Sequence, residues 1–341
     1  MSAAPAKVTT GQSREIVAAS LDHLAQIVLP NGRFIYAHEA GDTGNVHDGY
    51  NLLRHCGTVW FMARAATATG PTPPATLDAI RRAAGYIGRK LEPAPWAKAG
   101  QPSLALVGRG MVKLGGLGLG LLALSEVRKL PGALPDLPLG PDETLARMRR
   151  YALDEIDGDD FRHKRLLATG EVTPFRSDYY TGEAIFGLLV TGPCDTDLTR
   201  VTTSLMRRGY GWAQQSHWMA YAACEAAERG VVQPALGSAY LTGLMEGILS
   251  DSHYRARRQS TPIACRTEAL TRVLHLARRR PDLMTPDFLT RIRAHAAENL
   301  SLQLDWYQDG QFWKGDDARK VQIDYIQHNA TAFLHWADLE A

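Results

Sequence analysis

Apolar residues recur with the spacing of an α-helix along almost the whole chain, and this periodicity limits the possible folds more than any other feature. Proline and glycine fall mostly between the periodic segments, where one helix would end and the next begin. We therefore predict an all-α protein of twelve helices that form six consecutive hairpins. The predicted spans are 13–28, 50–68, 75–91, 111–130, 142–155, 179–191, 196–207, 213–229, 234–249, 262–280, 286–303 and 322–338.

The connections inside the hairpins are often long and contain short strand-like stretches, at 33–37, 103–107, 161–166 and 311–314. Loops of one kind share one rim in an array of antiparallel hairpins, so these loops should build a single face. The NGRF stretch near the start is echoed by DGQF near the end. Similar first and last repeats indicate a closed ring whose ends meet. We predict a disordered tail over residues 1–12 and a single domain over 13–341.

The charge balance argues against a dedicated nucleic-acid binder, since 38 Lys and Arg against 36 Asp and Glu give a net charge of only +2. The sequence contains no run of eighteen apolar residues, so it predicts no membrane-spanning helix. The first residues, MSAAPAKVTTGQS, lack the apolar core of a signal peptide. The expected location is therefore the cytoplasm, or the periplasm or exterior if a signal peptide has been removed.

Neither the cysteines nor the histidines show the spacing of a metal site. Cys56, Cys194, Cys224 and Cys265 are scattered and are expected to be ordinary, mostly buried cysteines. The candidate histidines lie on different predicted helices without an i, i+4 partner, so no metal and no cofactor are predicted. The glycine-rich run at 115–120 is expected to allow close helix packing, because no P-loop lysine follows it.

The second helix of each predicted hairpin is polar in its first turn and apolar beyond it. A buried helix that is polar at only one end must direct that end to water or to a ligand. If these helices form an inner ring, their polar openings converge at the mouth of one cavity. The candidate site residues at these openings are Asp48, Tyr50, Arg54, His55, Lys113, Tyr180, Glu183, His217, Trp218, Arg266, Glu268, Asp324, Gln327 and His328.

Each candidate also has a structural interpretation. Acidic and hydroxyl residues at helix starts are common N-caps. His55 and His328 could be hydrogen-bonded core histidines. Arg54 and Arg266 stand in apolar segments, where a buried arginine needs a carboxylate partner, and a nearby glutamate could be that partner instead of a catalytic group.

Four sequence segments, together with the six hairpins, resemble the (α/α)6 toroid of six-hairpin glycosidase-like proteins. These segments are DGYNLLRHCGTVW, YYTGEAIFGLLV, SHWMAYAACEA and DYIQHNATAFL, and the resemblance covers roughly residues 13–340. It implies a carbohydrate ligand in the central cleft, with Trp and Tyr side chains stacked on sugar faces. The fold also hosts glycoside hydrolases, polysaccharide lyases and sugar epimerases, so it does not define the reaction.

Our leading hypothesis is a glycoside hydrolase that acts on a polysaccharide or oligosaccharide. Such hydrolysis needs two carboxyl groups, one protonated and one ionised. Glu183 is the predicted acid, because its apolar neighbours would raise its pKa. Asp48, in a loop that water can reach, is the predicted second carboxylate, and the remaining candidates are predicted to bind substrate.

Two other classes stay open. A lyase or epimerase for an acidic sugar would use Arg54 or Arg266 to neutralise the sugar carboxylate, and Tyr180 or His217 to move a proton. A non-catalytic toroid could bind glycans or act as a scaffold among the partners of a polysaccharide-secretion system. In every case the expected ligand is a carbohydrate, while the sugar and the oligomeric state are left open.

Overall fold

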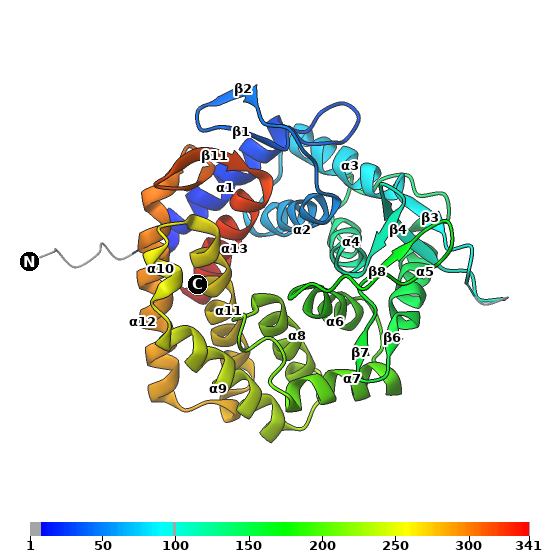
Figure 1. Cartoon of the computed structure of the whole chain (residues 1–341). Helices are drawn as coiled ribbons and strands as arrows, with labels where there is room; N and C mark the ends of the chain where they lie inside the picture. Colours follow the sequence, from blue (N-terminus) through cyan, green and yellow to red (C-terminus); the bar gives the residue numbers. More distant parts are fainter. Residues whose placement is uncertain (1–7, 98–99, 341) are drawn as a thin grey trace, which may run out of the picture.

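The computed structural model describes residues 8–97 and 100–340, which form a closed ring of helical hairpins (Figure 1). Each inner helix contacts the next around the ring, and the last contacts the first. The all-α (α/α)6 toroid prediction is confirmed. The inner helices are α2 (Leu52–Ala68), α4 (Leu114–Val127), α6 (Tyr180–Thr191), α8 (His217–Glu228), α11 (Ser260–Arg279) and α13 (Ile323–Glu340). The outer helices are α1 (Thr10–Gln26), α3 (Pro74–Gly88), α5 (Gly140–Asp154), α7 (Thr196–Arg207), α9 (Pro234–Ser250) and α12 (Pro286–Gln303).

The helices follow the predicted spans, with two differences. The short helix α10 (His253–Ala256) was not predicted, because one turn is too short to show a helical period. Helix α1 begins at Thr10, inside the predicted tail, where the Thr9 hydroxyl caps it by accepting from the Gln12 amide. Residues 1–7 of that predicted tail lie outside the described residues. Two 3-10 turns, Pro281–Leu283 and Leu304–Trp306, flank α12.

The inner helices are buried on nearly every side, because they pack on one another and are covered by the outer helices (Figure 1). In α4, every residue except Glu126 is buried. This burial explains why the inner segments are apolar beyond their first turns. Among the described residues, we find no helix with both the length and the hydropathy that a membrane crossing needs.

Glycines in α4 and α6 let these two inner helices approach closely. A Cβ atom on Gly118 would lie 2.4 Å from the carbonyl oxygen of Glu183, and one on Gly187 would lie 2.6 Å from the carbonyl oxygen of Gly118. Neither position can hold a larger side chain without moving backbone. This contact agrees with the packing role predicted for the glycine-rich run.

Replacing Gly118 with alanine is expected to lower the free energy of unfolding by about 1–3 kcal/mol, since the methyl group would overlap backbone of α6. Gly11→Ala in α1 is a matched control, because the new Cβ would find no contact closer than 4.0 Å. That control should be neutral or stabilising by up to about 1 kcal/mol. Urea denaturation measures both variants, and an unchanged midpoint for Gly118→Ala would contradict this packing.

The loops at one end of the ring contain short strands, and one sheet joins the two ends of the chain. Its order is β2 (Asp42–Val46), β1 (Ala37–Glu39), β11 (Ala318–Gln322), β10 (Gln311–Gly315) and β9 (Tyr307–Gln308). Ala37 of β1 pairs with Gln322 of β11, so the first and last hairpins close the ring through backbone hydrogen bonds as well as through helix packing.

The other strands flank α4 and α5. A four-stranded sheet has the order β3 (Leu91–Pro93), β4 (Leu104–Gly108), β5 (Met111–Lys113) and β8 (Lys164–Leu166), and β6 (Ile156–Asp157) pairs with β7 (Asp160–Phe161). The strand-like stretches predicted at 103–107, 161–166 and 311–314 coincide with these elements and with β10. The stretch at 33–37 does not, because β1 starts only at Ala37.

Candidate functional site

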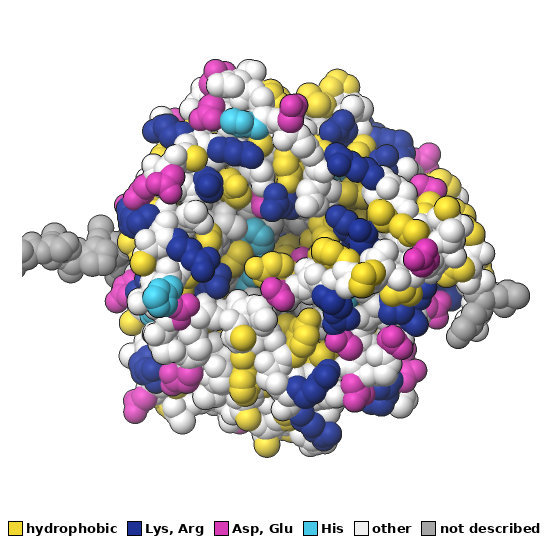
Figure 2. Space-filling model, viewed as in Figure 1, with side chains coloured by type: hydrophobic (Ala, Val, Ile, Leu, Met, Phe, Trp, Pro, Cys, Tyr) yellow, Lys and Arg dark blue, Asp and Glu magenta, His cyan; other side chains and the backbone are white. Residues whose placement is uncertain are grey.

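A cavity of about 360 Å3 lies where the inner helices begin. Figure 2 shows this face of the ring hollowed near its centre, with Lys and Arg side chains around the opening. The first turns of the inner helices line it, because each inner helix starts at this end of the ring, directly after a rim loop. The polar residues of the lining are Asn51, Arg54, Ser177, Tyr179, Tyr180, Glu183, Gln214, Gln215, His217, Trp218, Thr261, Cys265, Arg266, Asp324, Gln327 and His328.

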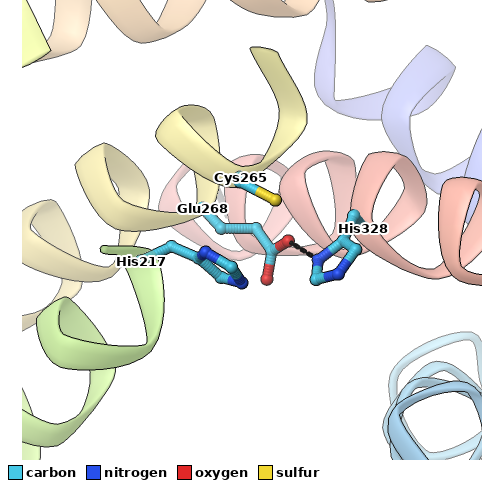
Figure 3. A group of neighbouring side chains, drawn as sticks. All are labelled: His217, Cys265, Glu268 and His328. Carbon is cyan, nitrogen blue, oxygen red and sulfur yellow. Dashed lines mark hydrogen bonds and ion pairs between the residues drawn. The ribbon is translucent and has the colours of Figure 1, made fainter. Parts of the chain in front are cut away.

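Two histidines and a glutamate meet at one side of the cavity (Figure 3). The Nδ1 atom of His328 lies 2.7 Å from Oε1 of Glu268, whose Oε2 accepts a hydrogen bond of 2.7 Å from the Tyr221 hydroxyl. His217 reaches the same place from α8, with its ring centre 5.0 Å from that of His328 and nearly perpendicular to it. Figure 3 shows the Glu268 carboxylate between the two imidazole rings, with Cys265 beside it.

The two histidines are held in opposite protonation states. Burial lowers the pKa of His217 well below 6.5, and neighbouring His328 and Arg266 lower it further. Burial also disfavours the charged form of His328, but Cys265 and Glu268 outweigh burial and raise its pKa well above 6.5. At neutral pH His217 is therefore a neutral base and His328 a cation. The Nε2 atom of His217 is buried and has no hydrogen-bond partner among the described residues, so no protein group engages it.

Glu183 contributes a third titratable group from the first turn of α6. It is 5% exposed, and its Oε2 atom has no hydrogen-bond partner among the residues that the structure describes. Burial raises the pKa of this carboxyl to about 8, and only the positive charge of His328 opposes the shift. Glu183 therefore holds its proton at neutral pH, and this rise in pKa agrees with the one predicted from its apolar neighbours, while its role as an acid stays a prediction.

The two arginines of the cavity have different partners. Arg54 pairs through Nε with Oδ2 of Asp324 at 3.0 Å. Its side chain is 45% exposed, so the expectation of a buried arginine is wrong and the pair lies at the mouth of the cavity. Arg266 donates instead to the amide oxygen of Gln215 at 2.8 Å, and Gln215 donates to Asp251. A neutral amide thus takes the place of the carboxylate expected beside Arg266.

The structure gathers most of the predicted residues but not all. Arg54, Tyr180, Glu183, His217, Trp218, Arg266, Asp324, Gln327 and His328 line the cavity, and Glu268 lies directly behind His328. Tyr50 and Lys113 line a neighbouring cavity instead.

Asp48 does not belong to either of these cavities. It is exposed, in the loop between α2 and β2, an edge strand with five exposed residues. The prediction that Asp48 supplies the second catalytic carboxylate is therefore not supported by its position.

His55 is a core residue. It is fully buried, its Nε2 lies 2.9 Å from the Ala83 carbonyl oxygen, and its Nδ1 lies 2.7 Å from the Tyr50 hydroxyl. Burial lowers its pKa to about 4, so it is neutral, donates through Nε2 and accepts through Nδ1. The prediction that His55 reaches the cavity is wrong, because α2 turns this residue toward α3.

Cys265 is one of the cavity residues that the candidate list lacks, and the one with the most reactive side chain. It was grouped with three scattered cysteines, of which Cys56 and Cys224 are buried as expected. Its position three residues before Glu268 was an available signal, because i and i+3 share one face of a helix.

One atom each of His217, Cys265, Glu268 and His328 lies within 4.8 Å of the others. Nitrogen, sulfur and carboxylate ligands at such separations could hold a thiophilic cation such as Zn2+ after small side-chain movements. The lack of a fixed metal-site spacing in the sequence therefore does not exclude a shared ion, since three different helices bring these residues together.

Comparison with known proteins identifies the fold. No protein-family model and no curated sequence matches the chain. Among solved structures, a D-mannose isomerase aligns over 98% of this chain and 99% of its own, with 10% identity and a TM-score of 0.66. A cellobiose 2-epimerase from Spirochaeta thermophila DSM 6192 aligns over 97% of both chains, with 12% identity and a TM-score of 0.67. Both share the (α/α)6 toroid over nearly their whole length, and at these identities the likeness concerns the fold alone.

Proposed function

We propose that this protein is a carbohydrate-active enzyme that isomerises or epimerises a reducing sugar by proton transfer at the carbon beside its carbonyl group. The observation that carries the proposal is the pairing of a neutral, unpartnered His217 with a charged His328 at one side of a cavity that also contains a protonated Glu183. A base and two acids facing one small cavity are what such proton transfers require. The isomerase and epimerase chemistry of the two similar folds is consistent with this choice.

The residues fit a balanced sequence of steps. The neutral imidazole of His217 takes the proton from the carbon beside the carbonyl, and the bonding electrons form a carbon–carbon double bond. Glu183 gives its proton to the carbonyl oxygen as that double bond forms, which yields an enediol. For isomerisation, His217 returns the proton to the former carbonyl carbon while the hydroxyl on the neighbouring carbon gives its proton to the Glu183 carboxylate, so that the carbonyl moves to that neighbouring carbon. For epimerisation, the open-chain enediol first turns its other face toward the two histidines, His217 returns the proton to the original carbon on that face, and the enediol hydroxyl returns its proton to Glu183.

Deuterium exchange tests the proposal directly. The protein is incubated in D2O with a panel of aldoses, ketoses and reducing disaccharides, and NMR follows both new sugars and loss of the proton beside the carbonyl group. We expect exchange at that carbon for at least one sugar. Absence of exchange for every sugar that binds the protein would reject the proposal.

Glycoside hydrolysis is the second candidate, and the protonated Glu183 is the observation that favours it. A second carboxylate is also needed, and Asp324 is the candidate, because it lines the cavity together with Glu183. Release of reducing ends from an oligosaccharide panel, without exchange of the proton beside the carbonyl group, would favour this function over isomerisation.

Exhaustive dialysis against a chelator is expected to leave sugar turnover unchanged, because the proposed chemistry uses the imidazole nitrogens themselves. Added Zn2+ is expected to inhibit, since a cation held by His217, Cys265, Glu268 and His328 would occupy the lone pair that His217 needs. Turnover is measured before dialysis, after it and after adding Zn2+. Activity that is lost on dialysis and restored by Zn2+ would contradict this expectation.

A further inference from the structure

A second cavity of about 370 Å3 adjoins the central one, and four cations line it without a carboxylate. We call it the basic subsite and define it by Arg33, Lys90, Arg109 and Lys113. Asn51 and Leu53 line both cavities, so the two are neighbours at the same mouth of the ring. A sugar whose reacting end faces Glu183 can therefore extend toward the basic subsite.

The four cations lack negative partners. Within residues 8–97 and 100–340, none of them forms an ion pair with a carboxylate, whereas arginines elsewhere on the ring commonly do, such as Arg82 with Asp78. The guanidinium of Arg33 instead lies 4.2 Å from the centre of the Tyr50 ring, and the Lys90 ammonium lies 5.5 Å from that of Tyr86. The subsite thus has aromatic walls and an unbalanced positive charge.

The arrangement of Lys113 is costly without an anion. In the antiparallel pairing of β5 with β8, Lys113 stands directly opposite Lys164, and like charges in that position destabilise a sheet. Burial lowers the pKa of Lys113, and Lys164 and Arg109 lower it further. A bound negative group would relieve this repulsion.

The backbone also points to an anion. Arg109 and Gly110 form the two-residue turn between β4 and β5, and Arg109 has a φ of 54°, a left-handed conformation that asparagine or glycine adopts more readily. A strained backbone conformation at a residue other than glycine indicates that its side chain, here the guanidinium of Arg109, has a function. Asn51 and Lys113 are the N-cap residues of α2 and α4, so the positive ends of two helix dipoles face the same cavity.

We propose that the basic subsite binds an anionic oxygen group of the substrate, either the carboxylate of a uronic acid or a phosphate, so that the sugar processed in the central cavity is negatively charged. The role as a substrate subsite rests on the proposed function, whereas the binding of the anion does not. Charge-assisted hydrogen bonds to two or more of these cations should make the anionic sugar bind at least about tenfold more tightly than its neutral counterpart.

The test compares glucose, glucuronate and glucose 6-phosphate by isothermal titration calorimetry at low salt, because these ligands share one ring and differ in the charged group. We expect at least one anion to bind about tenfold or more tightly than glucose, with a preference that shrinks as salt is added. The carboxylate and phosphate results separate the two sources of charge. If neither anion binds more tightly than glucose, the proposal is overturned.

The variant Arg109→Gln/Lys113→Gln should bind the anions no better than about twofold more tightly than glucose. The matched control, Arg207→Gln/Lys129→Gln, removes two charges from exposed positions outside the basic subsite and should keep the preference. Relief of the Lys113–Lys164 repulsion predicts a melting temperature for the first variant at least equal to that of the wild type. A preference that survives in the first variant would overturn the proposal.

Failure of this proposal and failure of the proposed function give different results. Anion binding is measured without turnover, so a preference for anions can be present even if deuterium exchange is absent. Deuterium exchange on neutral sugars together with equal binding of all three ligands would support the proposed isomerase function and reject anion binding at the basic subsite.

Discussion

Replacing His217 with glutamine is expected to lower turnover by at least about a hundredfold, within the range found when a general base is removed. Glutamine keeps a polar atom near the position of Nε2 but cannot accept a proton at neutral pH. The melting temperature should change little, because Nε2 has no partner that the substitution could strand. The expected result is therefore a stable and inactive protein that still binds sugar.

His253→Gln is the matched control. His253 is an exposed histidine on α10, outside both cavities, so this variant makes the same chemical change without touching the site. It should retain wild-type turnover and stability. A His217→Gln protein with more than about a third of wild-type turnover would remove His217 from the mechanism, and a large fall in its melting temperature would indicate a structural role.

The fold could be predicted because helical periodicity is a local property of the sequence. Inner helices such as α4 are apolar almost throughout, outer helices such as α7 have one apolar face, and the turns between them contain proline or glycine. Ring closure could be predicted only from the echo between the first and last loops. In the structure, the ring closes by the pairing of β1 with β11 and by the packing of α13 on α1 and α2.

The site could be predicted only in part, because a sequence gives the position of a side chain along a helix but not the direction in which it points. His55 directly follows Arg54, yet one faces the protein core and the other the mouth of the cavity. Asp48 could not be excluded, because only the three-dimensional structure shows that it lines neither cavity. The contact between Glu268 and His328 joins residues on α11 and α13 that are 60 positions apart, and no spacing rule reaches that far.

Glu183→Gln should also lower turnover by at least about a hundredfold, since the variant keeps the size of the side chain but loses its transferable proton. For the wild type, activity that depends on the protonated carboxyl should fall as pH rises through about 8, the pKa to which burial raises Glu183. This dependence holds for isomerisation and for hydrolysis alike, so Glu183 is a stringent test of whether the cavity is catalytic.

The same substitution should make the protein more stable at neutral pH. Below pH 4.5 the carboxyl is protonated in both the folded and the unfolded chain, so it adds no pH dependence. Between pH 4.5 and about 8 the unfolded chain has released this proton while the folded chain retains it, so stability falls as pH rises, by about 1.4 kcal/mol per unit. By pH 7 the free energy of unfolding of the wild type has fallen by about 3 kcal/mol, whereas the amide of Glu183→Gln does not titrate and causes no such fall.

Urea denaturation of wild type and Glu183→Gln at pH 5 and pH 7 measures this difference. The control for removing one carboxylate is Glu126→Gln, in the last turn of α4. The stability gained by Glu183→Gln should be larger at pH 7 than at pH 5, and the control should show no such change. Had Glu183 been the buried partner of Arg54 or Arg266, the variant would be less stable instead, because a cation would lose its counter-charge. Since Arg54 pairs with Asp324 and Arg266 with Gln215, neither arginine offsets the cost of burying Glu183, and under the proposed function that cost keeps the carboxyl protonated for the substrate.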